Sequence, residues 1–239
     1  MPKRVPCALE GWTKRGTKSA NLMQRTTPVY ELTMHLHRLV MPWPFRWQVE
    51  GRFHVPEGGV ILASNHISVA DPTCISAAIW YRKVDWMAKR SLYDIRGLGL
   101  LLRLLGTIPV SHDSADLGAF REALRRLALG RAVGIFPEGG ISRDGCLREG
   151  RQGVSTLAHR AQVPVIPVAI SGTCPLIRFK GLHPHFSVVR IRFGPPISPP
   201  AGRRLAAEER AAHTGLIMTA IADLQRQDSA GPQEIAENR

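Results

Sequence analysis

Hydrophobic and polar residues follow one another in blocks whose spacing alternates between that of strands and that of helices. Short apolar runs, several of them rich in β-branched residues, predict strands. The expected strands are residues 46–55, 59–64, 84–89, 107–111, 132–136, 163–170 and 186–193. Segments with apolar residues three and four positions apart predict helices. The expected helices are residues 29–40, 72–81, 98–105, 114–129, 153–161 and 203–226.

This alternation predicts an α/β fold, with a mostly parallel sheet flanked by helices and an amphipathic helix at its N-terminal end. The run 163–170 is continuous and β-branched, as in strands buried on both faces. A chain of 239 residues is long enough for one such domain. We therefore expect a single domain over residues 28–226, a flexible basic leader over 1–27 and a disordered polar tail over 227–239.

Composition narrows the possible partners. Lysine and arginine number 32 against 19 aspartates and glutamates, so the formal net charge is +13. Such an excess favours an anionic partner: nucleic acid, an acidic bilayer surface or a phosphate-bearing substrate. The four cysteines form no CxxC pair, so neither a zinc site nor a disulfide framework is indicated. No secretory signal and no stretch of 18 uncharged apolar residues is found, so we expect a cytoplasmic protein without a spanning helix.

A histidine and an aspartate follow the expected strand 59–64. His66 and Asp71 stand five positions apart, in a loop that enters a helix. An imidazole can take a proton from an alcohol, and a carboxylate on its other nitrogen stabilises the imidazolium. No GxSxG elbow places a nucleophile beside the pair, so direct attack by a substrate hydroxyl is the simpler chemistry. The alternative is a loop histidine and an aspartate that only caps the helix at Pro72.

A glycine-rich loop follows the expected strand 132–136. It carries Glu138, Gly139 and Gly140, with Arg143 three positions further on. In open α/β sheets, sites gather outside the carboxyl ends of strands, so this loop is a candidate wall of the same site. The alternative is an ordinary turn, with Arg143 and Lys89 as surface charges.

The motifs occur in an order that resembles a known family. They are Asn65-His66-x4-Asp71, then Lys89, then 105–110 (Leu-Gly-Thr-Ile-Pro-Val), 136–139 (Phe-Pro-Glu-Gly) and 163–168 (Val-Pro-Val-Ile-Pro-Val). This set resembles the glycerolipid acyltransferases, a group that includes bacterial 1-acyl-glycerol-3-phosphate acyltransferases. The resemblance covers about residues 45–200 and all four of the family's blocks.

The resemblance implies roles for individual residues. His66 would be the general base on the acceptor hydroxyl and Asp71 its orienting partner. Glu138 and Gly139 would shape the acceptor pocket, and Lys89 matches a basic residue associated with phosphate. The implied donor is a fatty acyl thioester on coenzyme A or acyl carrier protein, the implied acceptor is a lysophospholipid, and no metal or organic cofactor is implied.

Two positions depart from the family. Where its second block usually ends in arginine, this chain has His112, and where its third block reads Glu-Gly-Thr-Arg, this chain has Gly140 and Ile141. The family associates both arginines with the acceptor phosphate. We expect Arg143 and Lys89 to bind that phosphate, with His112 and Gly140 also in the substrate site. Acylation of a different lyso-lipid or polar alcohol stays open as an alternative.

Residues 29–47 combine aromatic, leucine and basic side chains, which suits an interfacial membrane anchor. The alternative is a helix packed on the domain's own sheet. With the net positive charge, we expect the protein to lie peripherally on the anionic inner face of the cell membrane. Two alternative functions are those of a lipid-binding homologue without catalysis and of a basic nucleic-acid-binding protein. No nucleic acid is expected, because the arginines are scattered and no recognised module occurs.

Overall fold

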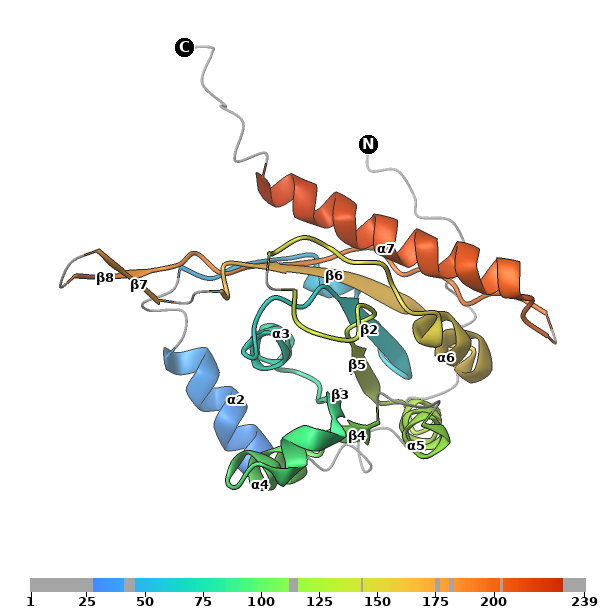
Figure 1. Ribbon diagram of the computed structural model, residues 1–239, viewed down its shortest axis with the longest axis horizontal. Helices are drawn as coiled ribbons and strands as arrows, with labels where there is room; N and C mark the ends of the chain where they lie inside the picture. The colour runs from blue at the N-terminus through green and yellow to red at the C-terminus, as the bar shows by residue number, and fades with distance from the viewer. Residues whose placement is uncertain are drawn as a thin grey trace, which may run out of the picture.

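A seven-stranded sheet forms the centre of the molecule (Figure 1). The computed structural model describes residues 28–40, 46–111, 116–142, 144–174, 177–180, 183–202 and 204–229. The strands of this sheet are β1 (Gln48–Glu50), β2 (Val60–Ser64), β3 (Val84–Lys89), β4 (Ile108–Val110), β5 (Ala132–Ile135), β6 (Val165–Ser171) and β9 (Arg190–Phe193). They lie in the order β1-β9-β6-β2-β5-β3-β4. Neighbours run parallel except β6 and β9, so the predicted mostly parallel α/β sheet is confirmed.

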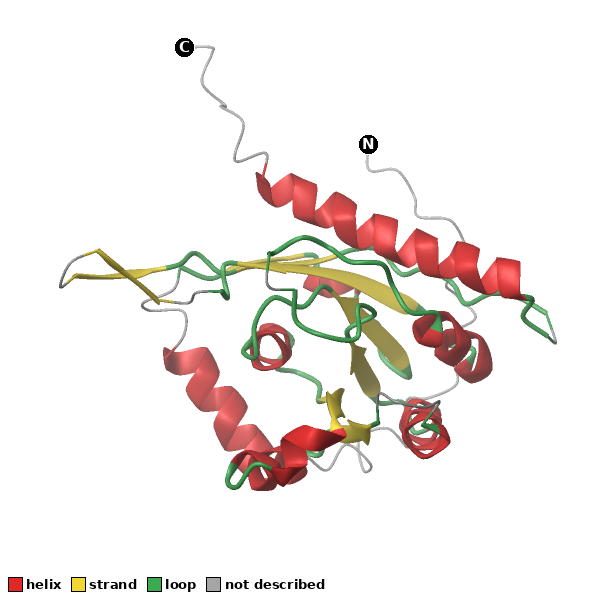
Figure 2. Ribbon diagram, viewed as in Figure 1, coloured by secondary structure: helices red, strands yellow, loops and turns green. Residues whose placement is uncertain are grey.

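Helices cover both faces of the sheet (Figure 2). They are α2 (Pro28–Val40), α3 (Asp71–Ala78), α4 (Leu98–Leu105), α5 (Leu117–Ala128), α6 (Gly153–Ala161) and α7 (Ala207–Ser229). Side chains of β2 alternate between two cores. Val60 and Leu62 pack with Ile75 of α3, whereas Ile61 and Ala63 pack with residues of α5, α6 and α7. A strand buried on both faces in this way belongs at the centre of a parallel sheet.

Helix α2 has two apolar faces. Tyr30 and Met34 are buried against Ala77 of α3, so one face packs on the domain. The other face carries exposed leucines, and α2 lies beside α4, which also exposes leucines. These side chains are Leu32, Leu36 and Leu39 of α2 and Leu100, Leu101 and Leu104 of α4. Packing on the domain therefore accounts for only one face of the helix expected over residues 29–40.

Two predicted strands are shorter in the structure. The segment 46–55 forms only β1, followed by a 3-10 helix, Arg52–His54. The chain leaves the strand at Gly51, whose φ is +70°, and a Cβ there would lie 2.0 Å from the carbonyl oxygen of Phe193. Glycine alone accommodates this turn. The segment 186–193 forms β9 from Arg190 onward.

A hairpin of β7 (Ile177–Lys180) and β8 (His183–Phe186) projects from the sheet and was not predicted. Its strands are four residues long, and Pro184 interrupts the second, so the strand pattern is weak. At the C-terminal end, α7 continues to Ser229, three residues beyond the expected helix end. The predicted leader over 1–27 and residues 230–239 of the predicted tail lie outside the described residues.

Candidate active site at the carboxyl edge of the sheet

The candidate residues follow three neighbouring strands at one edge of the sheet. β2 lies between β5 and β6 and runs parallel to both. Parallel strands place their carboxyl ends at the same edge, where sites of α/β proteins form. His66 follows β2, Glu138 follows β5 and Thr173 follows β6. Residues that are about a hundred positions apart in the chain thus meet in one place.

His66 and Asp71 form a direct hydrogen bond. Nδ1 of His66 lies 2.8 Å from Oδ2 of Asp71. Because the carboxylate accepts, Nδ1 carries the proton and Nε2 of the neutral ring keeps its lone pair. Within the described part of the chain, no hydrogen bond engages Nε2. The side chain of His66 is 15% exposed and that of Asp71 is fully buried, so the base faces outward and its partner lies beneath it.

The carboxylate of Asp71 also shapes the loop that carries His66. Oδ2 accepts the backbone N–H groups of Ile67 at 2.7 Å and Ser68 at 2.8 Å. Asp71 is the first residue of α3, and the residue before it, Ala70, occupies the N-cap position. The carboxylate is thus turned back on the preceding loop and on the imidazole, and it is not the simple helix cap of the alternative interpretation.

Asn65 joins β2 to β6 beyond the last paired residue. Its Nδ2 donates to the carbonyl of Ile170 at 2.9 Å, and its Oδ1 accepts the N–H of Ile170 at 2.8 Å. The side-chain amide therefore satisfies both backbone groups of a strand residue. The carbonyl of His66 accepts the N–H of Ser142 at 2.7 Å, so the glycine-rich loop is tied to the same segment.

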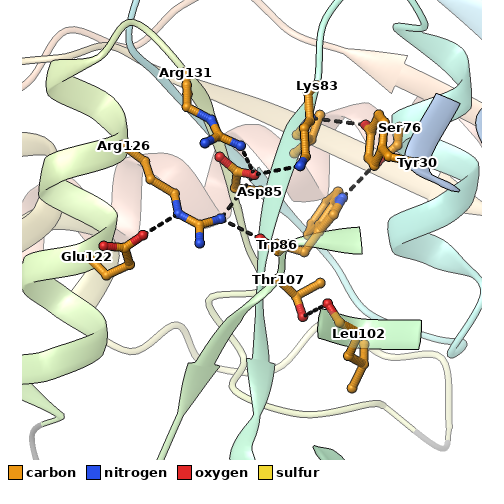
Figure 3. Close-up of polar contacts among 12 residues, drawn as sticks. Tyr30, Ser76, Lys83, Asp85, Trp86, Leu102, Thr107, Glu122, Arg126 and Arg131 are labelled. Atoms are coloured by element: carbon orange, nitrogen blue, oxygen red, sulfur yellow. Dashed lines mark hydrogen bonds and ion pairs between the residues drawn. The ribbon is translucent and has the colours of Figure 1, made fainter. Parts of the chain in front are cut away.

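Aromatic rings support one side of the imidazole. The ring of Phe136 stacks on His66 with centroids 3.8 Å apart, and Trp86 of β3 stacks on Phe136 at 4.8 Å. Nε1 of Trp86 donates to Oγ of Ser76 at 2.8 Å, which orients the indole (Figure 3). At Gly134 a Cβ would lie 2.4 Å from the Trp86 ring, so only glycine leaves room for this stack. The position of Phe136 next to the Pro-Glu-Gly motif is visible in the sequence, but its contact with His66 is not.

Glu138 is buried, and its carboxylate binds the backbone of the site. Oε1 accepts the N–H of His66 at 2.9 Å, and Oε2 accepts the N–H of Arg148 at 3.2 Å. Burial raises the pKa of Glu138, and the two backbone hydrogen bonds oppose that shift. Both oxygens are engaged, so this carboxylate holds the His66 loop in position, in addition to any part it has in the acceptor pocket.

Gly139 and Gly140 have different surroundings. Gly139 has φ of +74°, and a Cβ there would lie 2.6 Å from Nε of Arg151. The Arg151 side chain therefore lies against the glycine loop. The backbone N–H of Arg151 donates to the carbonyl of Pro137 at 2.9 Å. A Cβ at Gly140 would meet nothing within 4 Å. Arg151 was not among the predicted residues, although it lies only 12 positions beyond Gly139.

The remaining predicted residues are placed less closely. Lys89 is exposed at the carboxyl end of β3, which is separated from β2 by β5. It shares the edge of the sheet with His66, and no contact joins the two in the described residues. His112 and Arg143 lie outside the described residues.

A second charged cluster lies at the amino-terminal edge of the strands. Asp85 of β3 is fully buried, and its Oδ1 lies 3.0 Å from Nη1 of Arg126 and 2.6 Å from Nη2 of Arg131 (Figure 3). Lys83 approaches the same oxygen at 3.9 Å. The side chain of Arg126 turns inward from α5 to neutralise an aspartate that β3 supplies.

Comparison with known proteins identifies the family. A sequence model of the Acyltransferase family matches residues 46–171, which is more than half of the chain. The chain belongs to the Acyltransferase family. The match spans the segment from before β2 to the end of β6, and so includes His66, Asp71 and Glu138.

Relatives of this acyltransferase-family chain share one printed name, 1-acyl-sn-glycerol-3-phosphate acyltransferase. The Escherichia coli protein is 29% identical over 174 residues, covering 71% of this chain and 70% of its own length. The Bacillus subtilis protein is 26% identical over 117 residues, covering 48% and 57%. The Borreliella burgdorferi protein is 31% identical over 128 residues, covering 52% and 51%. The matched part thus spans only about half the length of the latter two relatives.

The fold is also that of a solved acyltransferase. The crystal structure of 1-acyl-sn-glycerophosphate acyltransferase from Thermotoga maritima superposes with a TM-score of 0.65 at 24% identity, covering 86% of this chain and 85% of the other. In the described ranges, no helix is long and apolar enough to cross a bilayer. The same residues hold no group of three or more His, Cys, Asp or Glu side chains that could bind a metal.

Proposed function

We propose that this protein transfers a fatty acyl group from a thioester of coenzyme A or acyl carrier protein to the free hydroxyl of a lysoglycerolipid. The proposed acceptor is 1-acyl-sn-glycerol-3-phosphate, which would yield phosphatidic acid. The observation that carries the proposal is the His66–Asp71 pair, which leaves Nε2 of His66 without a hydrogen bond among the described residues, at the edge where α/β sheets form their sites.

The proposed mechanism uses His66 as base and then as acid. Nε2 takes the proton of the acceptor hydroxyl as its oxygen attacks the thioester carbonyl, and Asp71 stabilises the imidazolium. The new C–O bond forms, the C–S bond breaks, and the proton passes from His66 to the departing sulfur. No covalent acyl-enzyme is needed. The proposed reaction involves no cofactor beyond the thioester substrate.

The histidine is tested by rate measurements with a matched control. In His66→Ala we expect thiol release to fall by at least about 10²-fold, the usual scale of general acid–base catalysis. The control is His54→Ala, which removes a histidine bonded to the carbonyl of Phe193 at 2.8 Å, away from the carboxyl edge. Circular dichroism must show that both variants are folded. A folded His66→Ala protein with the turnover of the control refutes the mechanism.

The acceptor is tested separately. Guanidinium groups suit phosphate, and among the described residues Arg151 has its side chain against the glycine loop. In Arg151→Ala and Lys89→Ala we expect a higher KM for 1-acyl-sn-glycerol-3-phosphate and little change in thioester hydrolysis without acceptor. Arg143→Ala is expected to act in the same way.

Ile141 favours the alternative of a different lyso-lipid or polar alcohol. It lies next to Ser142, whose backbone N–H donates to the carbonyl of His66, and its side chain is apolar. An unchanged KM in all three variants supports that alternative.

The proposal places the enzyme peripherally on the inner face of the cell membrane. The leucines Leu32, Leu36 and Leu39 of α2 are 69%, 57% and 77% exposed, and α4 extends this apolar face. Such a face can enter the bilayer interface, and the net charge of +13 attracts anionic lipids. Leu36→Ser combined with Leu39→Ser should reduce sedimentation with phosphatidylglycerol vesicles. Leu216→Ser on α7, also an exposed leucine, is the matched control. An equal loss of sedimentation in both proteins refutes α2 as the membrane-binding element.

A further inference from the structure

Asp71 has a fourth hydrogen-bond donor that comes from a distant strand. The hydroxyl Oγ1 of Thr173 lies 2.5 Å from Oδ1 of Asp71. Thr173 is 1% exposed, so no water competes for this carboxylate oxygen from that side. The other oxygen, Oδ2, already accepts His66, Ile67 and Ser68. The threonine is thus the donor that engages Oδ1 within the described residues.

The backbone after β6 is built to bring this hydroxyl to the site. Gly172 has φ of +78°, and a Cβ there would lie 1.9 Å from the carbonyl oxygen of Val188. Only glycine allows this close approach. The turn carries Thr173 from the end of β6 back over the neighbouring β2 loop. The short sequence Ser171-Gly172-Thr173 therefore serves a contact 102 positions away.

We infer that Thr173 is a positioning residue for the His66–Asp71 pair, acting through the Asp71 carboxylate. This inference rests on the proposed role of His66 as base. With one oxygen held by Thr173, the carboxylate cannot rotate about its Cβ–Cγ bond, and the other oxygen stays aimed at Nδ1. The hydroxyl also withdraws charge from the carboxylate. It therefore sets how strongly Asp71 favours the imidazolium.

The test compares variants that differ in the hydroxyl. Thr173→Val keeps the shape and removes the donor, whereas Thr173→Ser keeps the donor. Rates are measured with palmitoyl-coenzyme A and 1-oleoyl-sn-glycerol-3-phosphate. In Thr173→Val we expect kcat to fall by about tenfold, the size of a lost hydrogen bond to a charged group, with both KM values nearly unchanged. Thr173→Ser should retain most of the activity. If the valine variant does not fold, the Ser and Ala variants isolate the hydroxyl, because both lack the methyl group.

A second readout is the pH dependence of the rate. The acid limb of the pH–rate profile should move to higher pH in Thr173→Val, because the carboxylate keeps more negative charge. The control is Thr214→Val, which removes another buried hydroxyl, on α7, and should leave the profile in place. A role in packing alone would change stability without moving the profile.

The outcomes separate this inference from the proposed function. If Thr173→Val has the wild-type kcat and an unchanged pH–rate profile while His66→Ala is inactive, the positioning role is wrong and the acyl-transfer mechanism stands. If folded His66→Ala is fully active, the proposed function fails first. A double variant with Asp71→Asn should show no further loss from Thr173→Val. A loss that is additive in that background contradicts an action through Asp71.

Discussion

Two buried aspartates stand at opposite edges of the same sheet, and their surroundings differ. Asp71, at the carboxyl edge, accepts hydrogen bonds from the imidazole of His66, from two backbone N–H groups and from one hydroxyl. All four donors are neutral when the imidazole is unprotonated. Asp85, at the amino-terminal edge, faces two guanidinium groups and one ammonium, all on a single oxygen.

The difference lies in what balances the charge. At Asp85 the two guanidinium charges are permanent, because arginine is always protonated. The negative charge of Asp85 therefore stabilises the packing of β3, α5 and the start of β5. At Asp71 the neutral donors fix the carboxylate without cancelling its charge, and among the described residues no lysine or arginine forms an ion pair with it. The charge stays available for an imidazolium that exists only during the reaction.

The two aspartates should respond differently when each is neutralised in turn. Asp71→Asn should lower kcat by about 10²–10⁴-fold, because the amide cannot stabilise the imidazolium. Asp85→Asn should leave kcat within about twofold at a temperature where the protein is folded, because no contact joins it to His66. Thiol-release assays on both variants check this. A similar loss of kcat in the two folded proteins contradicts the division of roles.

The second prediction concerns stability. Asp85→Ala leaves Lys83, Arg126 and Arg131 without their shared partner, and we expect the free energy of unfolding to fall by about 3–5 kcal/mol. Arg125→Ala is the control, because its pair with Glu122 is largely exposed and should cost less than about 1 kcal/mol. Urea denaturation measures both. An equal effect of the two variants shows that the buried cluster is not the main contributor.

A third prediction extends the comparison to histidines. His213 is buried, with Nδ1 2.9 Å from Oγ of Ser155 and Nε2 3.1 Å from the carbonyl of Ser198, so both nitrogens are engaged. Burial lowers the pKa of His213 below its ordinary 6.5. The folded state therefore binds this proton less readily than the unfolded chain, and stability is lost as the pH falls below that value.

This loss should disappear in His213→Asn. The measurement is the free energy of unfolding between about pH 5 and 7.5, where a pKa change of one unit corresponds to about 1.4 kcal/mol. His159→Asn is the control on α6, since it also removes a buried histidine whose Nδ1 bonds a backbone carbonyl, that of Pro200 at 3.1 Å. If the free energy of unfolding depends on pH in the same way in wild type and in His213→Asn, His213 is not the group responsible for the loss.

The smallest effect is expected at Cys74. It lies three positions after Asp71 and is fully buried, and burial raises its pKa to about 12. Such a thiol is not a nucleophile at neutral pH. Cys74→Ser should keep kcat within about twofold, and mass spectrometry of protein incubated with thioester alone should show no acylated Cys74 peptide. An acylated peptide would replace direct transfer with a covalent mechanism.

Local sequence accounts for most of the helices and strands and for the motifs. The bounds of β3, α4 and α6 agree with the predicted segments. Gly97 and Gly106 flank α4, and α6 begins at Gly153. Local periodicity decides which face of an element is apolar. The five-residue spacing of His66 and Asp71 lies within one loop, so their contact was also predictable. The departures at His112 and Ile141 were visible as well.

The residues that complete the site are brought together by the order of the strands in the sheet. Thr173 reaches Asp71, Asn65 pairs with Ile170, and Phe136 stacks on His66 because β2 lies between β5 and β6. Strand order is set by how all the elements pack together, and no local pattern records it. For the same reason the ion pair of Arg126 with Asp85 is not visible in the sequence, because Asp85 lies 41 positions earlier on a strand. Periodicity shows which face of an element is apolar, and the packed sheet determines which partners the polar side chains meet.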